Sequence, residues 1–479
     1  MLFTKEEVAL FENKRELSFS TEDLTRIGIV QLSSEGKPHF IHRTFAEYYV
    51  ADCLENLLTE GNNTSEELLT FILHCIFLSA GYRMIRVFVD GLLSKSNPSN
   101  KVLKQFEKGI WNFSIPRLYM SWFRDFNVNH ETSSSCQFHY LPLIEVALLE
   151  GNINIIGFLL DSLHIDTFKK MLLPKQMSRD TIWYHAVLSN NKQGLQKLRE
   201  CAEKKLTAEE IRNKVLLATD YGGRTVWHLV AECGSLEILE AIWVWAKEKL
   251  TTEEINNKLL LGTDNAGKTA WHLAAKWCHL EILQMVWERA KEKLTTEEIN
   301  NKLLLGTDSD GKTAWHLAAK WGHLDVLQKI WEWAKEKLTR EEINNKLLLA
   351  TYCKGKTAWQ LAAEGGNSEV LEKIWYWSRE KLTSEEINNK LFATGDKGRT
   401  FWHVAAQRWN FEKLLKVWNW AKEKLTTEEI NKKLLLATDY KGRTVLHLAA
   451  EWANLRALEK VWEKANENLT TEEIKINCY

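Results

Sequence analysis

Two segments of the chain carry a motif that is typical of phosphate-binding loops. Gly262–Thr269 reads Gly-Thr-Asp-Asn-Ala-Gly-Lys-Thr and fits the pattern Gly-x4-Gly-Lys-Ser/Thr, and Gly306–Thr313 fits it again. A true loop of this kind follows a buried strand and wraps a phosphate with free backbone N–H groups. Here the preceding residues have helical periodicity, and Asp264 and Asp308 would repel a phosphate. We therefore predict turns in both segments, and a P-loop ATPase is the weakest of the functional alternatives.

A second candidate for chemistry is a regular series of histidines. Its members are His228, His272, His316, His403 and His447, and Gln360 stands where one more would fall. Metal ligands must converge on one point, whereas residues about 44 positions apart in a regular series belong to successive repeats and form a ladder. No Ser–His–Asp, Cys–His or paired-carboxylate arrangement stands out either. We therefore predict no enzyme, no cofactor and no metal site.

The composition favours a folded cytoplasmic protein that binds neither nucleic acid nor membrane. The 479 residues carry a formal net charge of −1 and include 22 tryptophans. A nucleic-acid-binding protein normally shows a basic face, and the eight cysteines form no Cys-x-x-Cys pair. Acidic residues follow Met1 where a signal peptide needs a basic start and an apolar run. The longest apolar stretch, residues 68–81, is shorter than the roughly 18 residues of a membrane span.

The elements that would position these residues repeat along the chain. Thr-Ala-Trp-His-Leu-Ala-Ala and its variants place one large apolar residue, here called the anchor, at a fixed point of each repeat. The anchors are Trp227, Trp271, Trp315, Trp359, Trp402 and Leu446, at steps of 44 residues with a single step of 43. Weaker copies lie at Trp183 and at residues 141–147. We therefore expect eight repeats from about residue 139 to the end.

One repeat, residues 264–305, contains signals for a turn and three helices. Asp264–Lys268 is rich in turn residues, and Thr269 can cap the short apolar helix that follows. Cys278-His279 interrupts this helix, and apolar residues then recur with helical spacing up to about Lys293. The capping-box sequence Thr295–Glu298 begins a third helix. None of these helices can bury its apolar face alone, so neighbouring repeats must stack.

The segment Gly311–Leu324, Gly-Lys-Thr-Ala-Trp-His-Leu-Ala-Ala-Lys-Trp-Gly-His-Leu, resembles the ankyrin repeat Gly-x-Thr-Pro-Leu-His-x-Ala-Ala-x-x-Gly-His. It differs from the ankyrin pattern in three ways. Ala or Val replaces the Pro, Trp replaces the Leu, and a third helix lengthens the repeat beyond the usual 33 residues. The resemblance implies an all-α, ankyrin-like α-solenoid with an extra third helix per repeat. It also implies that the histidine series ties turns together with nearby threonines, that Gln360 puts this bond in doubt in its own repeat, and that the protein recognises another protein.

The tryptophans fall into three registers besides a few that stand apart. The anchors and a second set sixteen residues later are expected in the core; the second set is Trp243, Trp287, Trp331, Trp375, Trp418 and Trp462. A third set is expected to pack the third helix and consists of Trp245, Trp333, Trp377 and Trp420.

Trp277, Trp321 and Trp452 differ because they stand six residues after the anchor, at a position that faces the concave groove in ankyrin repeats. Exposed aromatic side chains in a groove are typical binding residues. The candidate partner-binding residues are Lys276, Trp277, Lys320, Trp321, Arg408, Glu451 and Trp452. The alternative is that the long third helix covers the three tryptophans.

The first 138 residues have a different pattern. Residues 27–32 and 38–42 read as a β-hairpin that is followed by a helix over 43–58. Phe40–Asp52 resembles the winged-helix end of NACHT-type signalling ATPases, whose ATP site lies upstream of this motif. Residues 68–93 and 102–126 read as further helices of a bridging region.

We therefore expect three domains: a winged-helix-like NACHT-associated remnant at 1–58, a helical bridging region at 59–138 and eight ankyrin-type repeats at 139–479. The expected function is a protein-interaction scaffold, as the C-terminal sensor part of a NACHT–ankyrin protein of innate-immunity type. The alternative is a free-standing ankyrin adaptor or effector, of a kind that recruits a ligase or acts in a symbiont or virus. The last repeat stops within its third helix, which suggests a chain truncated at both ends.

Overall fold

The computed structural model describes residues 30–32, 38–40, 47–48, 50–52, 54–55, 83–93, 142–162, 165–172, 182–391, 398, 400, 402–403, 411–452 and 454–478. Within these residues eight helical repeats follow one another, so the predicted all-α solenoid is confirmed. No helix in the described ranges is both long enough and apolar enough to cross a membrane.

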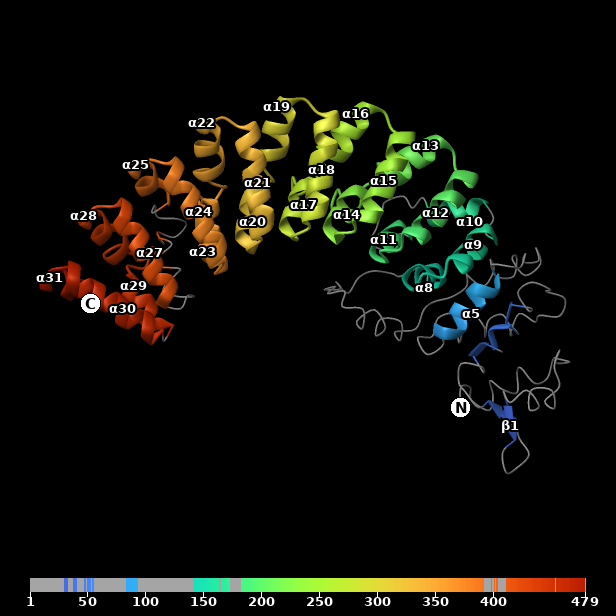
Figure 1. Ribbon diagram of the computed structural model, residues 1–479, viewed down its shortest axis with the longest axis horizontal. Helices are drawn as coiled ribbons and strands as arrows, with labels where there is room; N and C mark the ends of the chain where they lie inside the picture. The colour runs from blue at the N-terminus through green and yellow to red at the C-terminus, as the bar shows by residue number, and fades with distance from the viewer. Residues whose placement is uncertain are drawn as a thin grey trace. The chain divides into compact units, whose positions relative to one another are not determined.

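Seven of the repeats contribute a short first helix, a longer second helix and a third helix (Figure 1), and of the Trp402 repeat the structure describes the second and third helices. The first helices are α8 (Pro142–Glu150), α11 (Ile182–Leu188), α14 (Val226–Cys233), α17 (Ala270–Lys276), α20 (Ala314–Trp321), α23 (Ala358–Gly365) and α29 (Val445–Glu451). The second helices are α9 (Ile153–Ser162), α12 (Lys192–Lys205), α15 (Leu236–Lys249), α18 (Leu280–Lys293), α21 (Leu324–Lys337), α24 (Ser368–Lys381), α27 (Phe411–Lys424) and α30 (Leu455–Asn468).

The third helix usually begins as a short α-helix and continues as a π-helix, written η. These elements are α10 (Ile165–Leu172), α13 (Ala208–Ile211) with η3 (Arg212–Leu216), α16 (Thr252–Glu254) with η4 (Ile255–Leu260), α19 (Thr296–Glu298) with η5 (Ile299–Leu304), α22 (Arg340–Glu342) with η6 (Ile343–Leu348), α25 (Ser384–Glu386) with η7 (Ile387–Leu391), α28 (Thr427–Ile430) with η9 (Asn431–Leu435), and α31 (Thr471–Cys478).

The start of the third helix confirms the capping-box prediction, whereas its π continuation was not predicted. The Thr295 hydroxyl accepts the Glu298 N–H at 3.2 Å, and the Glu298 carboxylate accepts the Thr295 N–H at 3.1 Å. Further on, the Leu305 N–H donates to the carbonyl of Asn300, five residues back, at 3.0 Å. The Asn300 side chain donates to the Lys337 carbonyl at 3.0 Å, so the third helix of one repeat is tied to the second helix of the next.

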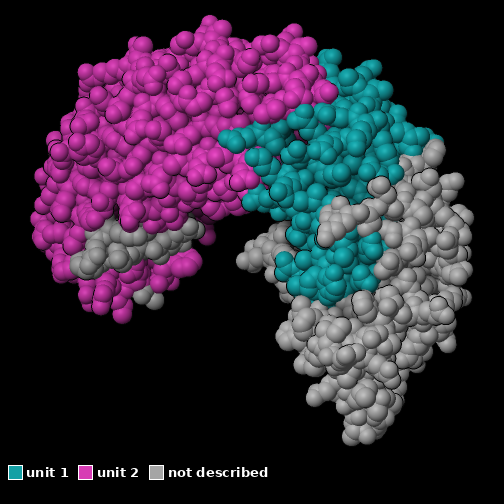
Figure 2. Space-filling model, turned by 45° about the vertical axis from the view of Figure 1, so that its right-hand side comes forward, with its two compact units in different colours: residues 1–221, 240–242 teal, residues 222–239, 243–479 magenta. Residues whose placement is uncertain are grey.

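The chain divides into two compact units, which Figure 2 shows in different colours. Unit 1 comprises residues 1–221 and 240–242, and unit 2 comprises 222–239 and 243–479. The predicted domain boundaries at 58 and 138 fall outside the described residues. Unit 1 contains the first two repeats, and unit 2 contains most of the later ones.

In unit 1, helix α5 (Arg83–Leu93) packs against the first repeat through a buried ion pair. The Arg86 guanidinium donates to both Glu150 carboxylate oxygens, at 2.6 and 2.8 Å, and both side chains are almost fully buried. The Asp90 carboxylate accepts the Ile155 N–H at 2.8 Å near the start of α9. This part of the predicted bridging region is therefore helical, while residues 68–82 and 102–126 lie outside the described residues.

The predicted N-terminal hairpin is confirmed. Strand β1 (Val30–Leu32) pairs antiparallel with β2 (Pro38–Phe40), with Gln31 opposite His39. Those of residues 47–55 that the structure describes are helical, as expected after the hairpin.

In unit 2 the turns that begin successive repeats are joined by backbone hydrogen bonds. The Asn265 N–H donates to the Gly222 carbonyl at 2.8 Å, and the Ser309 N–H donates to the Ala266 carbonyl at 2.9 Å. Gly267 adopts a φ of +70°, which an L-amino acid side chain disfavours. The turns therefore form a ladder that fixes the spacing of the first helices.

Tryptophan rings form the core of unit 2 and continue from one repeat to the next. Trp271 and Trp287 belong to one repeat and lie 5.9 Å apart between ring centroids. Trp333 of the following repeat stacks on Trp287 at 4.7 Å with an interplanar angle of 19°. The same arrangement recurs with Trp331 and Trp377, whose rings lie 4.7 Å apart. The third tryptophan set therefore joins repeats to one another.

Two positions show what this stacking requires. Arg289 stands at the third-set position of its repeat, and its guanidinium lies 5.7 Å from the ring centroid of Trp243, where its neighbours place an indole. Trp462 belongs to the second set, and its predicted burial is wrong because 42 % of it is exposed. Among the described residues no later repeat supplies a side chain to stack on it.

The anchor indoles are held in the core although their N–H groups are not satisfied. The Nε1 atoms of Trp227, Trp271 and Trp315 are buried and have no hydrogen-bond acceptor. Such a group costs about 1–3 kcal/mol, whereas burying roughly 150–250 Å² of an indole contributes about 4–6 kcal/mol at 25 cal/mol per Å². Burial of the ring therefore outweighs the unsatisfied N–H.

Candidate functional site

The two segments with the P-loop sequence are turns whose backbone N–H groups are already used. One Asp264 carboxylate oxygen accepts the N–H groups of Ala266 and Lys268, at 2.9 and 2.7 Å. The Gly267 N–H donates to the Asp264 carbonyl at 2.9 Å. The π-helix η4, and no strand, precedes the turn. The turn therefore lacks the free N–H groups that a phosphate needs.

The histidine series forms the hydrogen bonds that the ankyrin resemblance implies. Nδ1 of His272 accepts the Thr269 N–H at 3.3 Å and lies 2.9 Å from the Thr269 hydroxyl oxygen. Nε2 of His272 lies 3.0 Å from the Gly306 carbonyl oxygen of the next repeat. Since a carbonyl can only accept, Nε2 carries a proton, and since Nδ1 accepts the Thr269 N–H, it carries none and the ring is neutral.

Burial favours this neutral state. It lowers the pKa of His272, and it lowers the pKa of His316 to about 4. Gln360 forms the hydrogen bond within its own repeat that the histidines form, because its Oε1 accepts the Thr357 N–H at 2.9 Å. The described residues hold no group of three or more His, Cys, Asp or Glu placed to bind a metal ion.

Three tryptophans are exposed at the ends of first helices, as the groove interpretation requires. Trp277, Trp321 and Trp452 have exposed fractions of 47, 52 and 56 %. The alternative, in which the third helix covers them, is wrong. Helices α17 and α20 lie on the inner side of the curve that the repeats of unit 2 describe in Figure 1.

Hydrogen bonds from the next repeat fix the ends of α17 and α20. The His323 Nε2 lies 2.9 Å from the Lys276 carbonyl oxygen, and the Asn367 side-chain amide donates to the Lys320 carbonyl at 2.9 Å. These bonds satisfy carbonyls that a helix end would otherwise leave without a donor. The tryptophan next to each lysine is therefore held at a fixed place on the surface.

Each of these tryptophans carries a lysine above its ring. The Lys276 Nζ lies 4.4 Å from the Trp277 ring centroid, and the Lys320 Nζ lies 5.5 Å from that of Trp321. Burial lowers the pKa of Lys276, and repulsion from Lys268 and Lys320 acts in the same direction, while attraction from Glu232 and Asp264 opposes it. Two neighbouring repeats therefore bring their lysines into one positive region.

The charge at this place differs from that of other repeats. In three other repeats a basic residue just before the capping threonine pairs with a glutamate eight residues on. These pairs are Arg224–Glu232 at 2.6 Å, Lys356–Glu364 at 2.5 Å and Arg443–Glu451 at 2.6 Å. In the α17 and α20 repeats the glutamate is replaced by Lys276 and Lys320. The basic residue Lys268 thus meets a second base instead of an acid.

We define the Lys–Trp patch as Lys268, Lys276, Trp277, Lys320 and Trp321. Within the described part of the chain, none of its three lysines forms an ion pair. Lys312, the turn lysine of the α20 repeat, is paired with Asp310 at 2.5 Å and is left out of the patch.

The seven predicted partner-binding residues are not all brought together. Lys276, Trp277, Lys320 and Trp321 lie on adjacent repeats. Glu451 and Trp452 lie in the α29 repeat, which two intervening repeats separate from α20. Arg408 lies outside the described residues. Sequence reasoning missed Lys268, although the change from Glu to Lys eight residues later, visible on alignment of the repeats, would have pointed to it.

The fold and its stacked repeats define a helical solenoid with an exposed aromatic and basic patch. A comparison with protein families specifies the kind of solenoid, since the family model "Ankyrin repeat" matches residues 310–332. This segment includes α20 and Trp321, and it supports an ankyrin-repeat protein. No curated protein matches the sequence.

Proposed function

We propose that this chain is a protein–protein interaction module that binds its partner at the Lys–Trp patch and along the inner side of unit 2. The exposure of Trp277 and Trp321 carries the proposal, because the anchor, second-set and third-set tryptophans of the same repeats are buried. Partly exposed indoles on a rigid support are typical centres of protein interfaces. The ankyrin-repeat match at residues 310–332 favours the same role.

The rigidity of the support is part of the argument. The ends of α17 and α20 are held by hydrogen bonds from the next repeat to the carbonyls of Lys276 and Lys320, so the backbone that carries the two tryptophans is fixed before a partner binds. A partner therefore meets two indoles at a set spacing, and binding does not have to order the backbone.

Affinity capture with the full chain tests the proposal. The variant Trp277→Ala/Trp321→Ala removes both rings, and Val244→Ala/Tyr376→Ala is the matched control, since these residues are 49 and 50 % exposed on second helices. We expect at least one protein that wild type and control capture equally and the patch variant captures about tenfold less. Equal capture by all three proteins would show that the inner side is not the interface.

A finer assignment is that the chain forms the sensor part of a NACHT-type receptor rather than a free-standing adaptor. The antiparallel pairing of β1 and β2 and the helical residues after it support the resemblance to a winged-helix end. The full-length transcript tests this assignment: an in-frame nucleotide-binding domain upstream of Met1 is expected, and a transcript whose coding region encodes the repeats alone favours the adaptor.

A further inference from the structure

The Lys–Trp patch combines three positive charges with two exposed apolar rings on adjacent repeats. Its lysines have no acidic partner in the described part of the chain, whereas the corresponding bases at Arg224, Lys356 and Arg443 each have one. Among the repeats from Trp227 to Leu446, a lysine takes the place of this glutamate only in the α17 and α20 repeats, whereas Gln407 takes it in the Trp402 repeat. A local change of charge in an otherwise regular array marks a surface with its own specificity.

We propose that the Lys–Trp patch binds an acidic, extended segment of a partner protein, an inference that rests on the proposed function. Carboxylates of the segment pair with Lys268, Lys276 and Lys320. Its aliphatic side chains pack on the rings of Trp277 and Trp321. Glu232 and Asp264 do not fill this role, because Glu232 is paired with Arg224 and Asp264 accepts two N–H groups of its own turn.

The geometry of the stack sets the spacing of the acidic residues. Neighbouring helices pack about 8–10 Å apart. An extended chain in the polyproline II conformation covers this distance in about three residues, which is one turn, so residues three apart point to the same side. An acidic residue at every third position can therefore contact one repeat after another. The repulsion that lowers the pKa of Lys276 is relieved when such carboxylates bind.

A peptide is favoured over a nucleic acid by the limited extent of the charge. The patch holds three free lysines in a chain of formal net charge −1. A nucleic-acid site normally tracks a backbone with a longer basic stripe. Affinity for an oligonucleotide is accordingly one of the outcomes that would overturn the proposal.

The test uses the full chain and fluorescence anisotropy with a labelled probe. The probe is a peptide of about twelve residues with Glu at every third position and Leu and Ser between, with a Lys-for-Glu peptide and an oligothymidylate of similar length as comparisons. The variant is Lys276→Glu/Lys320→Glu. The matched control is Lys247→Glu/Lys335→Glu, because these lysines are exposed near the ends of second helices and the change in net charge is the same.

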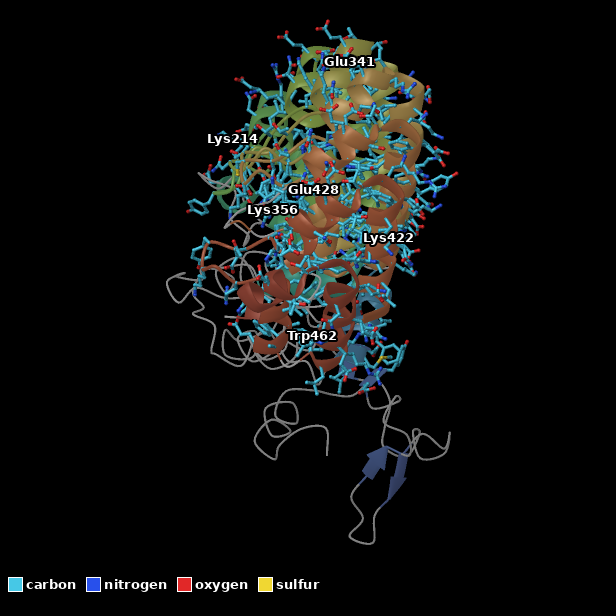
Figure 3. The ribbon with its side chains drawn as sticks, turned by 90° about the vertical axis from the view of Figure 1, so that its left-hand side faces the viewer. Lys214, Glu341, Lys356, Lys422, Glu428 and Trp462 are labelled. Carbon is cyan, nitrogen blue, oxygen red and sulfur yellow. The ribbon has the colours of Figure 1, made fainter. Side chains whose placement is uncertain are left out.

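Figure 3 shows why this control is suitable. Lys356 stands at the position of its repeat that corresponds to Lys268, and Lys422 stands at the position that corresponds to Lys247 and Lys335. In the figure Lys356 lies to the left of Lys422. The control lysines Lys247 and Lys335 stand in the last turns of second helices, whereas Lys276 and Lys320 stand in the last turns of first helices.

We expect the acidic probe to bind wild type and control, with an affinity that falls as salt is raised, and to bind the patch variant at least about tenfold more weakly. An equal loss of affinity for the acidic probe in the control variant would show that net charge alone explains the effect. Tighter binding of the oligonucleotide than of the acidic probe would show that the patch is a nucleic-acid site. Either result overturns the inference. If the probe fails to bind while capture of a partner still depends on Trp277 and Trp321, the proposed function stands and the acidic specificity falls.

Discussion

Replacing Trp333 tests whether the repeats are held together by tryptophan stacking. Trp333 is 6 % exposed, stacks on Trp287 at 4.7 Å and lies 5.4 Å from Trp271, both in the preceding repeat. Trp→Ala in a core costs about 3–5 kcal/mol in total. Two aromatic pairs, each contributing about 0.5–1.5 kcal/mol beyond its buried area, place Trp333 in the upper part of that range. We expect Trp333→Ala to lower the free energy of unfolding by about 4–5 kcal/mol.

Trp277→Ala is the matched comparison, because it removes the same side chain from a site that is 47 % exposed. We expect it to cost about 1 kcal/mol or less. Urea denaturation followed by far-ultraviolet circular dichroism measures both variants. Since a repeat array need not unfold in one step, hydrogen exchange of α18 and α21 adds a local measurement. A loss for Trp333→Ala no larger than that for Trp277→Ala would refute the stacking argument.

Further predictions concern the pH dependence, one backbone conformation and one ion pair. His316 has a pKa of about 4 in the folded chain against an ordinary 6.5, so between these pH values the unfolded chain binds a proton that the folded chain does not. The contribution of His316 to the free energy of unfolding is therefore full above pH 7 and falls between pH 6.5 and 4. In urea titrations His316→Gln should remove about 2 kcal/mol of the decrease in the free energy of unfolding between pH 7 and 5. Cys278 has a φ of +65° where the next repeat has Gly322, so Cys278→Gly should raise the free energy of unfolding by about 0.5–1 kcal/mol, and no gain in thermal unfolding would contradict the assigned strain. Arg86→Met should cost about 3–5 kcal/mol because it leaves the Glu150 carboxylate buried and unpaired, and Arg86→Met/Glu150→Leu should recover most of it; a double variant as unstable as the single one would count against the ion-pair account.

Local patterns allowed the elements of a repeat to be predicted well. Thr269, Thr295 and Lys293 mark helix boundaries because capping and helical spacing depend on neighbours in the sequence. The π-helix was not predicted, since the apolar spacing of Ile299, Leu303 and Leu304 does not distinguish a bond to the fifth residue back from one to the fourth.

Contacts between repeats were harder to predict from the sequence. The stacking of Trp333 on Trp287 depends on how two repeats approach each other, which the pattern of one repeat does not contain. The predicted burial of Trp462 was wrong for the same reason, because it depends on a neighbouring repeat. At the candidate site the sequence located Lys276, Trp277, Lys320 and Trp321, but it grouped them with Trp452, which two intervening repeats separate from α20.

The central claim is that a partner protein docks on the Lys–Trp patch. Carbodiimide cross-linking of the full chain in cell extract, which joins a lysine amine to a carboxylate as an amide, tests it most directly when it is followed by mass spectrometry. We predict cross-links from Lys276 and Lys320 to an acidic segment of one partner, and their loss in Trp277→Ala/Trp321→Ala but not in Val244→Ala/Tyr376→Ala. Cross-links confined to the third helices, at Lys302 and Lys346, and unchanged by the tryptophan substitutions would contradict the account.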